Sequence, residues 1–221
     1  MRVLIINPNT TASMTEKIAI AARAVARSGT VVTALNPASG PAAIQGPEDG
    51  TAALPGLFAL FDEEIETKRA HDMAVIACFD DTGLMELKAR SPIPVLGIGE
   101  AAFHAAMLIG DRFSVVTTLS VSVPVIEQNL ARYGFSARCA RVRASGIPVL
   151  ELENSPDAAF ETLAAEISRA LGEDGCQSIV LGCAGMADLA ANLTRQFDVP
   201  VIDGVAAAIA LGESLHQLSR P

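Results

Sequence analysis

Short apolar runs rich in Val and Ile alternate along the chain with longer segments in which apolar residues recur at helical spacing. This alternation predicts an α/β protein, and runs that are apolar throughout are typical of parallel strands covered by helices on both faces. The expected strands are Val3–Ile6, Thr30–Leu35, Met73–Ala77, Pro94–Ile98, Phe113–Thr117, Ala137–Val142, Ser178–Leu181 and Val199–Ile202. The expected helices are about Ser13–Arg27, Ala52–Arg69, Leu84–Ala89, Glu100–Ile109, Val123–Tyr133, Pro156–Leu171, Met186–Gln196 and Val205–Gln217. The capping-box pattern Ser13-Met14-Thr15-Glu16 predicts where the first helix begins, and Gly29 is expected to end it.

The two halves of the chain contain a similar pattern. In each half an apolar strand ends at a cysteine, Cys78 or Cys183, and a helix and a second apolar strand opened by Pro94 or Pro200 follow at nearly equal spacing. A chance similarity of common βα units is the alternative explanation, but the coinciding cysteines argue against it. The repeat therefore predicts two similar lobes rather than one large sheet.

The predicted architecture follows from this repeat. We expect two Rossmann-like α/β lobes with parallel sheets, related by a pseudo-two-fold axis, with the active site in the cleft between them. The first lobe is predicted to comprise residues 1–97 with about 205–221, and the second residues 98–204.

Composition narrows the classes of function. The 221 residues are 50% hydrophobic, and 16 Lys and Arg against 25 Asp and Glu give a net charge of −9, which argues against a nucleic-acid partner. The initial apolar run is too short for a signal peptide, and no apolar stretch is long enough for a membrane helix. Four cysteines are too few for a disulfide scaffold. We therefore expect a soluble cytoplasmic protein with reduced thiols and no membrane partner.

The matched cysteines are the strongest candidates for chemistry. Cys78 and Cys183 each follow a strand and precede a predicted helix, and open α/β sheets bind ligands beyond the carboxyl ends of their strands. A helix N-terminus is expected to lower the pKa of each thiol. One thiolate and one thiol facing a carbon acid from opposite sides are the groups that racemisation requires. The alternative is that both are small buried residues, as we expect for Cys139 and Cys176.

Four motifs connect these observations to a known family. They are Ile6-Asn7-Pro8-Asn9-Thr10, Cys78-Phe79-Asp80-Asp81-Thr82-Gly83-Leu84, Ser114-Val115-Val116-Thr117-Thr118 and Gly182-Cys183-Ala184-Gly185-Met186. With them the chain resembles, over essentially its whole length, the cofactor-independent aspartate/glutamate/hydantoin racemase superfamily and, within it, the hydantoin and allantoin racemase branch. Glutamate racemases usually follow their cysteines with Asn-Thr and with Thr-His or Thr-Glu, which this chain lacks. Many members of the hydantoin branch carry Pro where Thr82 stands.

The resemblance implies roles for particular residues. Cys78 and Cys183 would be the two acid/base residues, acting at C5 of a 5-substituted hydantoin or of allantoin, without metal or cofactor, in a homo-oligomer. The backbone N–H groups expected to stabilise the enolate are those of Phe79, Asp80, Ala184 and Gly185. The side chains expected to contact the ring are Asn9, Thr10, Thr117 and Thr118. Ile44 is expected to cover the pocket from the loop Pro41–Gly50.

Other functions compete with this interpretation. Gly97-Ile98-Gly99-Glu100-Ala101-Ala102 matches a dinucleotide-binding fingerprint, although the next strand ends without the acidic residue that would hold a ribose. Nearer alternatives are a racemase of aspartate or glutamate, or a decarboxylase or cis–trans isomerase of the same superfamily. Outside enzymes, a two-lobed small-molecule binding protein is the alternative. His71, His104 and His216 show no metal-ligand spacing, so no metal site is expected.

Overall fold

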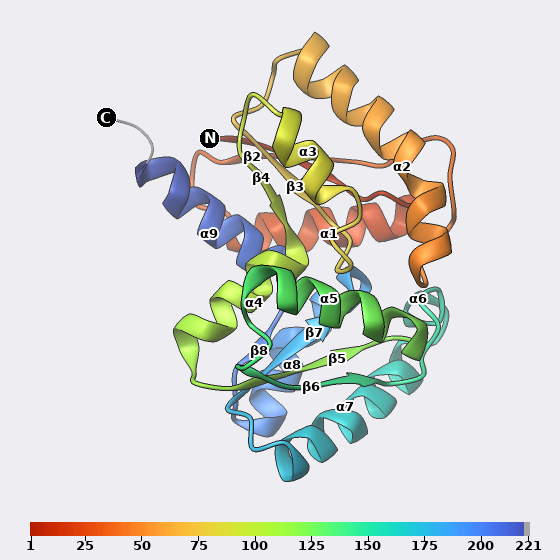
Figure 1. Ribbon diagram of the computed structural model, residues 1–221, viewed down its shortest axis with the longest axis vertical. Coiled ribbons are helices and arrows are strands. Elements are labelled where there is room, and N and C mark those ends of the chain that lie inside the picture. Colours follow the sequence, from red (N-terminus) through yellow and green to blue (C-terminus); the bar gives the residue numbers. More distant parts are fainter. Residues whose placement is uncertain (219–221) are drawn as a thin grey trace.

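In the computed structural model, which describes residues 1–218, the chain forms two four-stranded sheets whose strands are all parallel (Figure 1). The first sheet has the order β2-β1-β3-β4 and the second the order β6-β5-β7-β8. The strands are β1 Arg2–Ile6, β2 Val31–Leu35, β3 Met73–Ile76, β4 Val95–Gly97, β5 Phe113–Thr117, β6 Cys139–Ala144, β7 Ser178–Gly182 and β8 Val201–Ile202. The predicted α/β class and pair of parallel sheets are therefore confirmed, and every predicted strand is present.

The two sheets repeat one topology. In each, the first strand in sequence pairs with the second on one side and with the third on the other, and the fourth strand extends the sheet beyond the third. The central strands β1, β3, β5 and β7 are almost completely buried, as their largely apolar sequences predict. The repeat in the sequence is thus a repeat in the fold.

Helices cover both sheets. They are α1 Ala12–Val25, α2 Pro47–Phe61, α3 Leu84–Arg90, α4 Ile98–Ile109, α5 Val123–Tyr133, α6 Glu151–Asn154, α7 Pro156–Glu173, α8 Ala190–Phe197 and α9 Gly204–Leu218. The shorter elements are the π-helical η1 Asp62–Thr67 and the 3₁₀ segments η2 Ser120–Ser122 and η3 Ala184–Leu189. Every predicted helix is present, but α2 begins five residues early, with Pro47 in its first turn where proline is tolerated. The single turn α6 was not predicted.

The predicted ends of α1 were wrong. The helix begins at Ala12, and Ser13 does not cap it, because the Ser13 hydroxyl donates to Glu153 Oε2 at 2.7 Å. The Asn9 side chain instead accepts the N–H of Thr11 at 2.9 Å. At the other end the helix stops at Val25, and Gly29 lies in the following turn with φ +89°.

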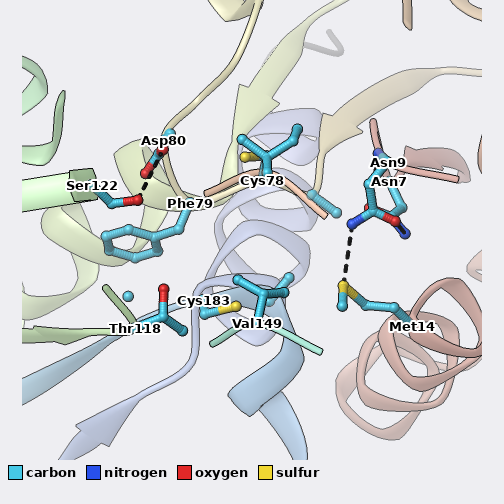
Figure 2. A pocket seen from close by; sticks show the side chains of 14 residues that line it. Asn7, Asn9, Met14, Cys78, Phe79, Asp80, Thr118, Ser122, Val149 and Cys183 are labelled. Atoms are coloured by element: carbon cyan, nitrogen blue, oxygen red, sulfur yellow. Dashed lines mark hydrogen bonds between the residues drawn. The ribbon is translucent and has the colours of Figure 1, made fainter. Parts of the chain in front are cut away.

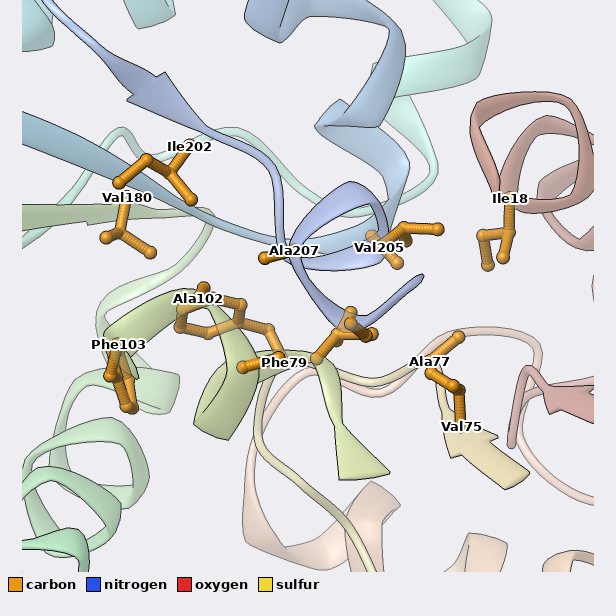
Figure 3. Close-up of a cluster of buried hydrophobic side chains, with 14 of the residues drawn as sticks. Ile18, Val75, Ala77, Phe79, Ala102, Phe103, Val180, Ile202, Val205 and Ala207 are labelled. Atoms are coloured by element: carbon orange, nitrogen blue, oxygen red, sulfur yellow. The ribbon is translucent and has the colours of Figure 1, made fainter. Parts of the chain in front are cut away.

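One apolar core joins the two sheets. Helices α4 and α9 pack against each other, and both contact β4 of the first sheet and β7 of the second. Phe103 of α4 is fully buried in this core, with its ring edge-to-face with Phe79 at a centroid distance of 5.5 Å (Figure 3). The Phe103 ring is also stacked on Phe113 at a centroid distance of 5.9 Å. This shared core fixes the carboxyl ends of the two sheets relative to each other. The division into lobes at residues 97/98 and 204/205 stays a prediction, and residues 219–221, assigned to the first lobe, lie outside the described residues.

Between residues 1 and 218, each helix is too short or too polar to cross a bilayer.

Candidate functional site

The carboxyl ends of the two sheets face a small cavity that contains both matched cysteines. In Figure 2 Cys78 and Cys183 lie on opposite sides of it, with Asp80 at one end and Asn9 at the other. Its volume is about 30 Å³, which is room for about two water molecules. The lining residues are Asn7, Asn9, Met14, Ile44, Ala77, Cys78, Phe79, Asp80, Thr118, Ser122, Val149, Gly182, Cys183 and Ala184.

Cys78 is held in a turn that follows β3. Its carbonyl oxygen accepts the N–H of Asp81 at 3.0 Å, its Sγ accepts the N–H of Asp80, and its Sγ lies 3.4 Å from the hydroxyl of Thr82. Helix α3 begins only at Leu84. The expectation that Cys78 lies at a helix N-terminus is therefore wrong, because a turn with the left-handed residues Asp81 and Gly83 intervenes.

Cys183 follows β7 in a similar turn. Its carbonyl oxygen accepts the N–H of Met186 at 3.1 Å, and its Sγ accepts the N–H of Gly185. The residue caps η3, a 3₁₀ segment, rather than an α-helix. Gly182 lets the strand end approach Thr117, whose hydroxyl donates to the Gly182 carbonyl at 2.9 Å. Both thiols thus accept a backbone N–H from two residues further along the chain.

Burial dominates the protonation of this site. It raises the pKa of the Cys78 thiol well above its usual range and that of Cys183 to about 12, and the nearby Asp80 carboxylate raises both further. Burial also raises the pKa of Asp80 to about 6. The predicted lowering of the thiol pKa values is therefore wrong, because the loss of hydration outweighs the single backbone donor at each sulfur. These shifts favour the protonated form of both thiols at neutral pH.

Most of the sequence-predicted residues meet here. Besides the two cysteines, the cavity is lined by Asn9, Ile44, Phe79, Asp80, Thr118 and Ala184. Thr10, Thr117 and Gly185 do not line it. Thr10 donates its hydroxyl and its N–H to the Pro41 carbonyl at 3.3 and 3.0 Å, and so holds the loop that carries Ile44. Contacts of all these residues with a substrate stay a prediction.

Six lining residues were missed: Asn7, Met14, Ala77, Ser122, Val149 and Gly182. Asn7 belongs to the polar motif after β1, and its Nδ2 donates to Asn9 Oδ1 at 2.9 Å, so the motif itself could have indicated it. Val149 gives no signal in the sequence. Its N–H donates to Gln45 Oε1 at 2.9 Å, and this bond joins the loop of Ile44 to the second half of the chain.

The charge of the cavity is distinctive. Asp80 and the two cysteines are the ionisable residues of its lining as described for residues 1–218, and Lys, Arg and His do not contribute. Cys139 and Cys176 lie elsewhere, each with its Sγ near a backbone carbonyl. Over the same residues, His, Cys, Asp and Glu side chains do not gather in groups of three that could hold a metal ion.

The dinucleotide fingerprint has a different explanation. The N–H groups of Gly99 and Glu100, which open α4, donate to the carboxylate of Asp81 at 3.0 and 2.8 Å. A Cβ at Gly97 or Gly99 would collide with that carboxylate. The helix N-terminus that would bind a pyrophosphate is therefore already occupied by a side chain of the chain itself.

Comparisons with known proteins agree on one group of enzymes. A family model described as Asp/Glu/Hydantoin racemase matches residues 3–212. The hydantoin racemase of Rhizobium meliloti is 46% identical over 217 residues, covering 97% of this chain and 88% of the relative. The allantoin racemase from Klebsiella pneumoniae superposes with a TM-score of 0.95 at 44% identity, covering 99% of this chain and 88% of that one. The allantoin racemase from Pseudomonas fluorescens gives 0.92 at 42% identity, covering 99% and 92%.

Proposed function

Because the chain belongs to the Asp/Glu/hydantoin racemase family, we propose that it racemises 5-substituted hydantoins, allantoin among them, by proton transfer at C5 between two cysteines without a cofactor. The support is the high identity to hydantoin and allantoin racemases over nearly the whole chain, together with two thiols on opposite sides of one cavity. The enzyme is thus an isomerase of the hydantoin and allantoin racemase type.

The proposed chemistry begins after one of the two thiols has lost its proton to solvent, which leaves one thiolate and one thiol. The thiolate of one cysteine takes the C5 proton, the C5–H electron pair moves into the adjacent carbonyl to form an enolate, and the other thiol returns a proton to the opposite face. The two cysteines then exchange roles for the other enantiomer. The raised thiol pKa values make each thiolate, once formed, a strong base toward a carbon-bound proton. The lining N–H groups of Phe79 and Ala184 are candidate donors to the enolate oxygen.

The charges of the side chains that line the cavity favour one class of substrate over the other. Asp80 is acidic, and Lys, Arg and His are missing from the lining as described for residues 1–218. Free aspartate or glutamate would bury its carboxylates beside Asp80 without a cation to pair with them, which is costly. A hydantoin ring is neutral and carries N–H donors that a carboxylate accepts. The lining therefore favours hydantoins over amino acids.

The cavity must widen to admit such a ring, because it has room for only about two water molecules. We assign this movement to the loop Pro41–Gly50, where Ile44 lines the cavity and Gln45 bonds to Val149 on the far side. Ile44 is thus the proposed cover of the bound substrate.

The test is a substrate panel with a metal chelator present. Enantiopure allantoin and 5-benzylhydantoin should lose optical rotation faster with the enzyme than with the Cys78→Ser/Cys183→Ser double variant, which serves as the protein blank. L-Aspartate and L-glutamate should keep theirs. Racemisation of an amino acid but of neither hydantoin, or a requirement for added metal, would refute the proposal. Saturable hydantoin binding without racemisation would instead support a binding protein.

A further inference from the structure

The loop that carries Cys78 is bonded to helices of the other half of the chain. It leaves the first sheet at β3, yet its donors come from α4 and α5, which pack against the second sheet. Asn129 Nδ2 donates to the Asp80 carbonyl at 2.8 Å, and the Tyr133 hydroxyl donates to Asp81 Oδ2 at 2.9 Å. Asn129 and Tyr133 are one helical turn apart and so lie on the same face of α5. One face of one helix thus holds two consecutive residues of this loop.

Asp81 is the centre of this arrangement. Its carboxylate is buried and accepts three hydrogen bonds, from the N–H groups of Gly99 and Glu100 and from Tyr133. Its φ of +50° is uncommon for a residue with a side chain, so the surrounding contacts must hold it in place. Its own N–H donates to the Cys78 carbonyl at 3.0 Å. The carboxylate is therefore connected to the catalytic candidate through three residues of backbone.

Within residues 1–218, the hydrogen bonds given for the Cys183 turn do not include a comparable carboxylate anchor. Its segment η3 packs against α1, which occupies in the first half the place that α5 occupies in the second. The residues after Cys183 are Ala184, Gly185 and Met186, which carry no carboxylate. The described ion pair between these elements joins Lys17 to Asp188 at 3.9 Å, with both side chains partly exposed. The polar attachment described for the Cys78 loop is therefore not repeated at Cys183.

We propose that Asp81 is a positioning residue that, through Tyr133 and the first turn of α4, sets where the Cys78 thiol stands relative to Cys183. This inference rests on the proposed function, because only a two-cysteine reaction makes that position matter to a rate. Under this proposal the two cysteines are held in different ways. Hydrogen bonds to α4 and α5 fix the turn of Cys78, whereas apolar packing supports the turn of Cys183. Misplacement of a reacting group by about 1 Å can reduce a rate by about 100-fold.

The test compares Tyr133→Phe and Asp81→Asn with Asp203→Asn. Asp203 is a matched control, because its buried carboxylate also caps a helix, accepting the N–H groups of Val205 and Ala206 at 3.1 and 2.8 Å, but at α9 and away from the cavity lining. Iodoacetamide alkylation of each cysteine is followed by mass spectrometry of its peptide, a readout that requires no racemase activity. We expect Cys78 to react about tenfold faster in Tyr133→Phe, with the rate at Cys183 unchanged.

Activity gives the second readout. With the hydantoin that the enzyme racemises, kcat should fall about tenfold in Tyr133→Phe and about 100-fold in Asp81→Asn, while KM changes less than threefold. Asp203→Asn should leave the ratio of the two alkylation rates unchanged. Equal acceleration at both cysteines, or none at Cys78, would overturn the positioning role even if racemisation were established. If Asp81→Asn does not fold, Tyr133→Phe alone decides.

Discussion

Cys78 and Cys183 face each other across one cavity and have the same backbone environment. Each follows the third strand of its sheet, and each thiol accepts the N–H of the second residue after it. Two thiols of similar environment suit a reaction whose forward and reverse steps use the same two groups in exchanged roles. The surroundings of the two turns differ, because Asp80 and Asp81 follow Cys78, whereas Ala184 and Gly185 follow Cys183.

The Asp80 carboxylate adds to the effect of burial on both cysteines. It raises the pKa of each thiol and is itself ionised above about pH 6. Asp80→Asn removes this charge, so both thiols should react with iodoacetamide about tenfold faster at pH 8. Asp111→Asn, a surface variant that loses only the partner of Arg138, is the control and should change neither rate. Unchanged reactivity of both cysteines in Asp80→Asn would contradict the electrostatic coupling.

Stability should fall as the pH rises from 5 to 8. Burial raises the pKa of Asp81 to about 7, so its contribution to stability is complete below about pH 3.8 and is lost as the pH rises through 7. Asp80, with a pKa of about 6, acts in the same direction. The lowered pKa values of Glu64 and Asp174 affect stability only at lower pH, outside this window.

The measurement is urea unfolding of the wild type and of Asp81→Asn at pH 5 and pH 8. The free energy of unfolding of the wild type should fall by on the order of 3 kcal/mol over this range because of Asp81 alone. The loss should be clearly smaller in Asp81→Asn. A wild-type stability that rises between pH 5 and pH 8 would show that hydrogen bonding to the carboxylate outweighs its burial.

Much of this fold could be predicted from the sequence, because the buried parallel strands are largely apolar and alternate with helices. The pairing of Cys78 with Cys183 followed from the repeat in the same way. The predicted lowering of the thiol pKa values was wrong because these values depend on burial and on the Asp80 charge, which a local sequence pattern does not show. Val149 was missed because only the folded chain brings it to the loop of Ile44.

A substitution of Gly97 tests whether the glycines of the dinucleotide fingerprint leave room for the Asp81 carboxylate. A Cβ at this position would collide with the Asp81 carboxylate and with Leu84, so Gly97→Ala should lower the free energy of unfolding by about 1–3 kcal/mol. Gly172→Ala is the matched control, because a Cβ there meets no neighbour within 4 Å in helix α7, and it should stabilise the chain by about 0.5–1 kcal/mol. Urea unfolding measures both. Equal effects of the two substitutions would refute the close approach of Asp81 to Gly97.

The central claim is that Cys78 and Cys183 act on opposite faces of one carbon. The most direct measurement follows C5 deuteration and optical rotation of an enantiopure 5-substituted hydantoin in deuterium oxide, with the wild type and with Cys78→Ser and Cys183→Ser. The wild type should racemise the substrate and introduce deuterium at C5. Each single variant should lose racemisation by at least about 100-fold, and any exchange that remains should proceed with retained configuration. Full racemisation by either single variant would contradict the account.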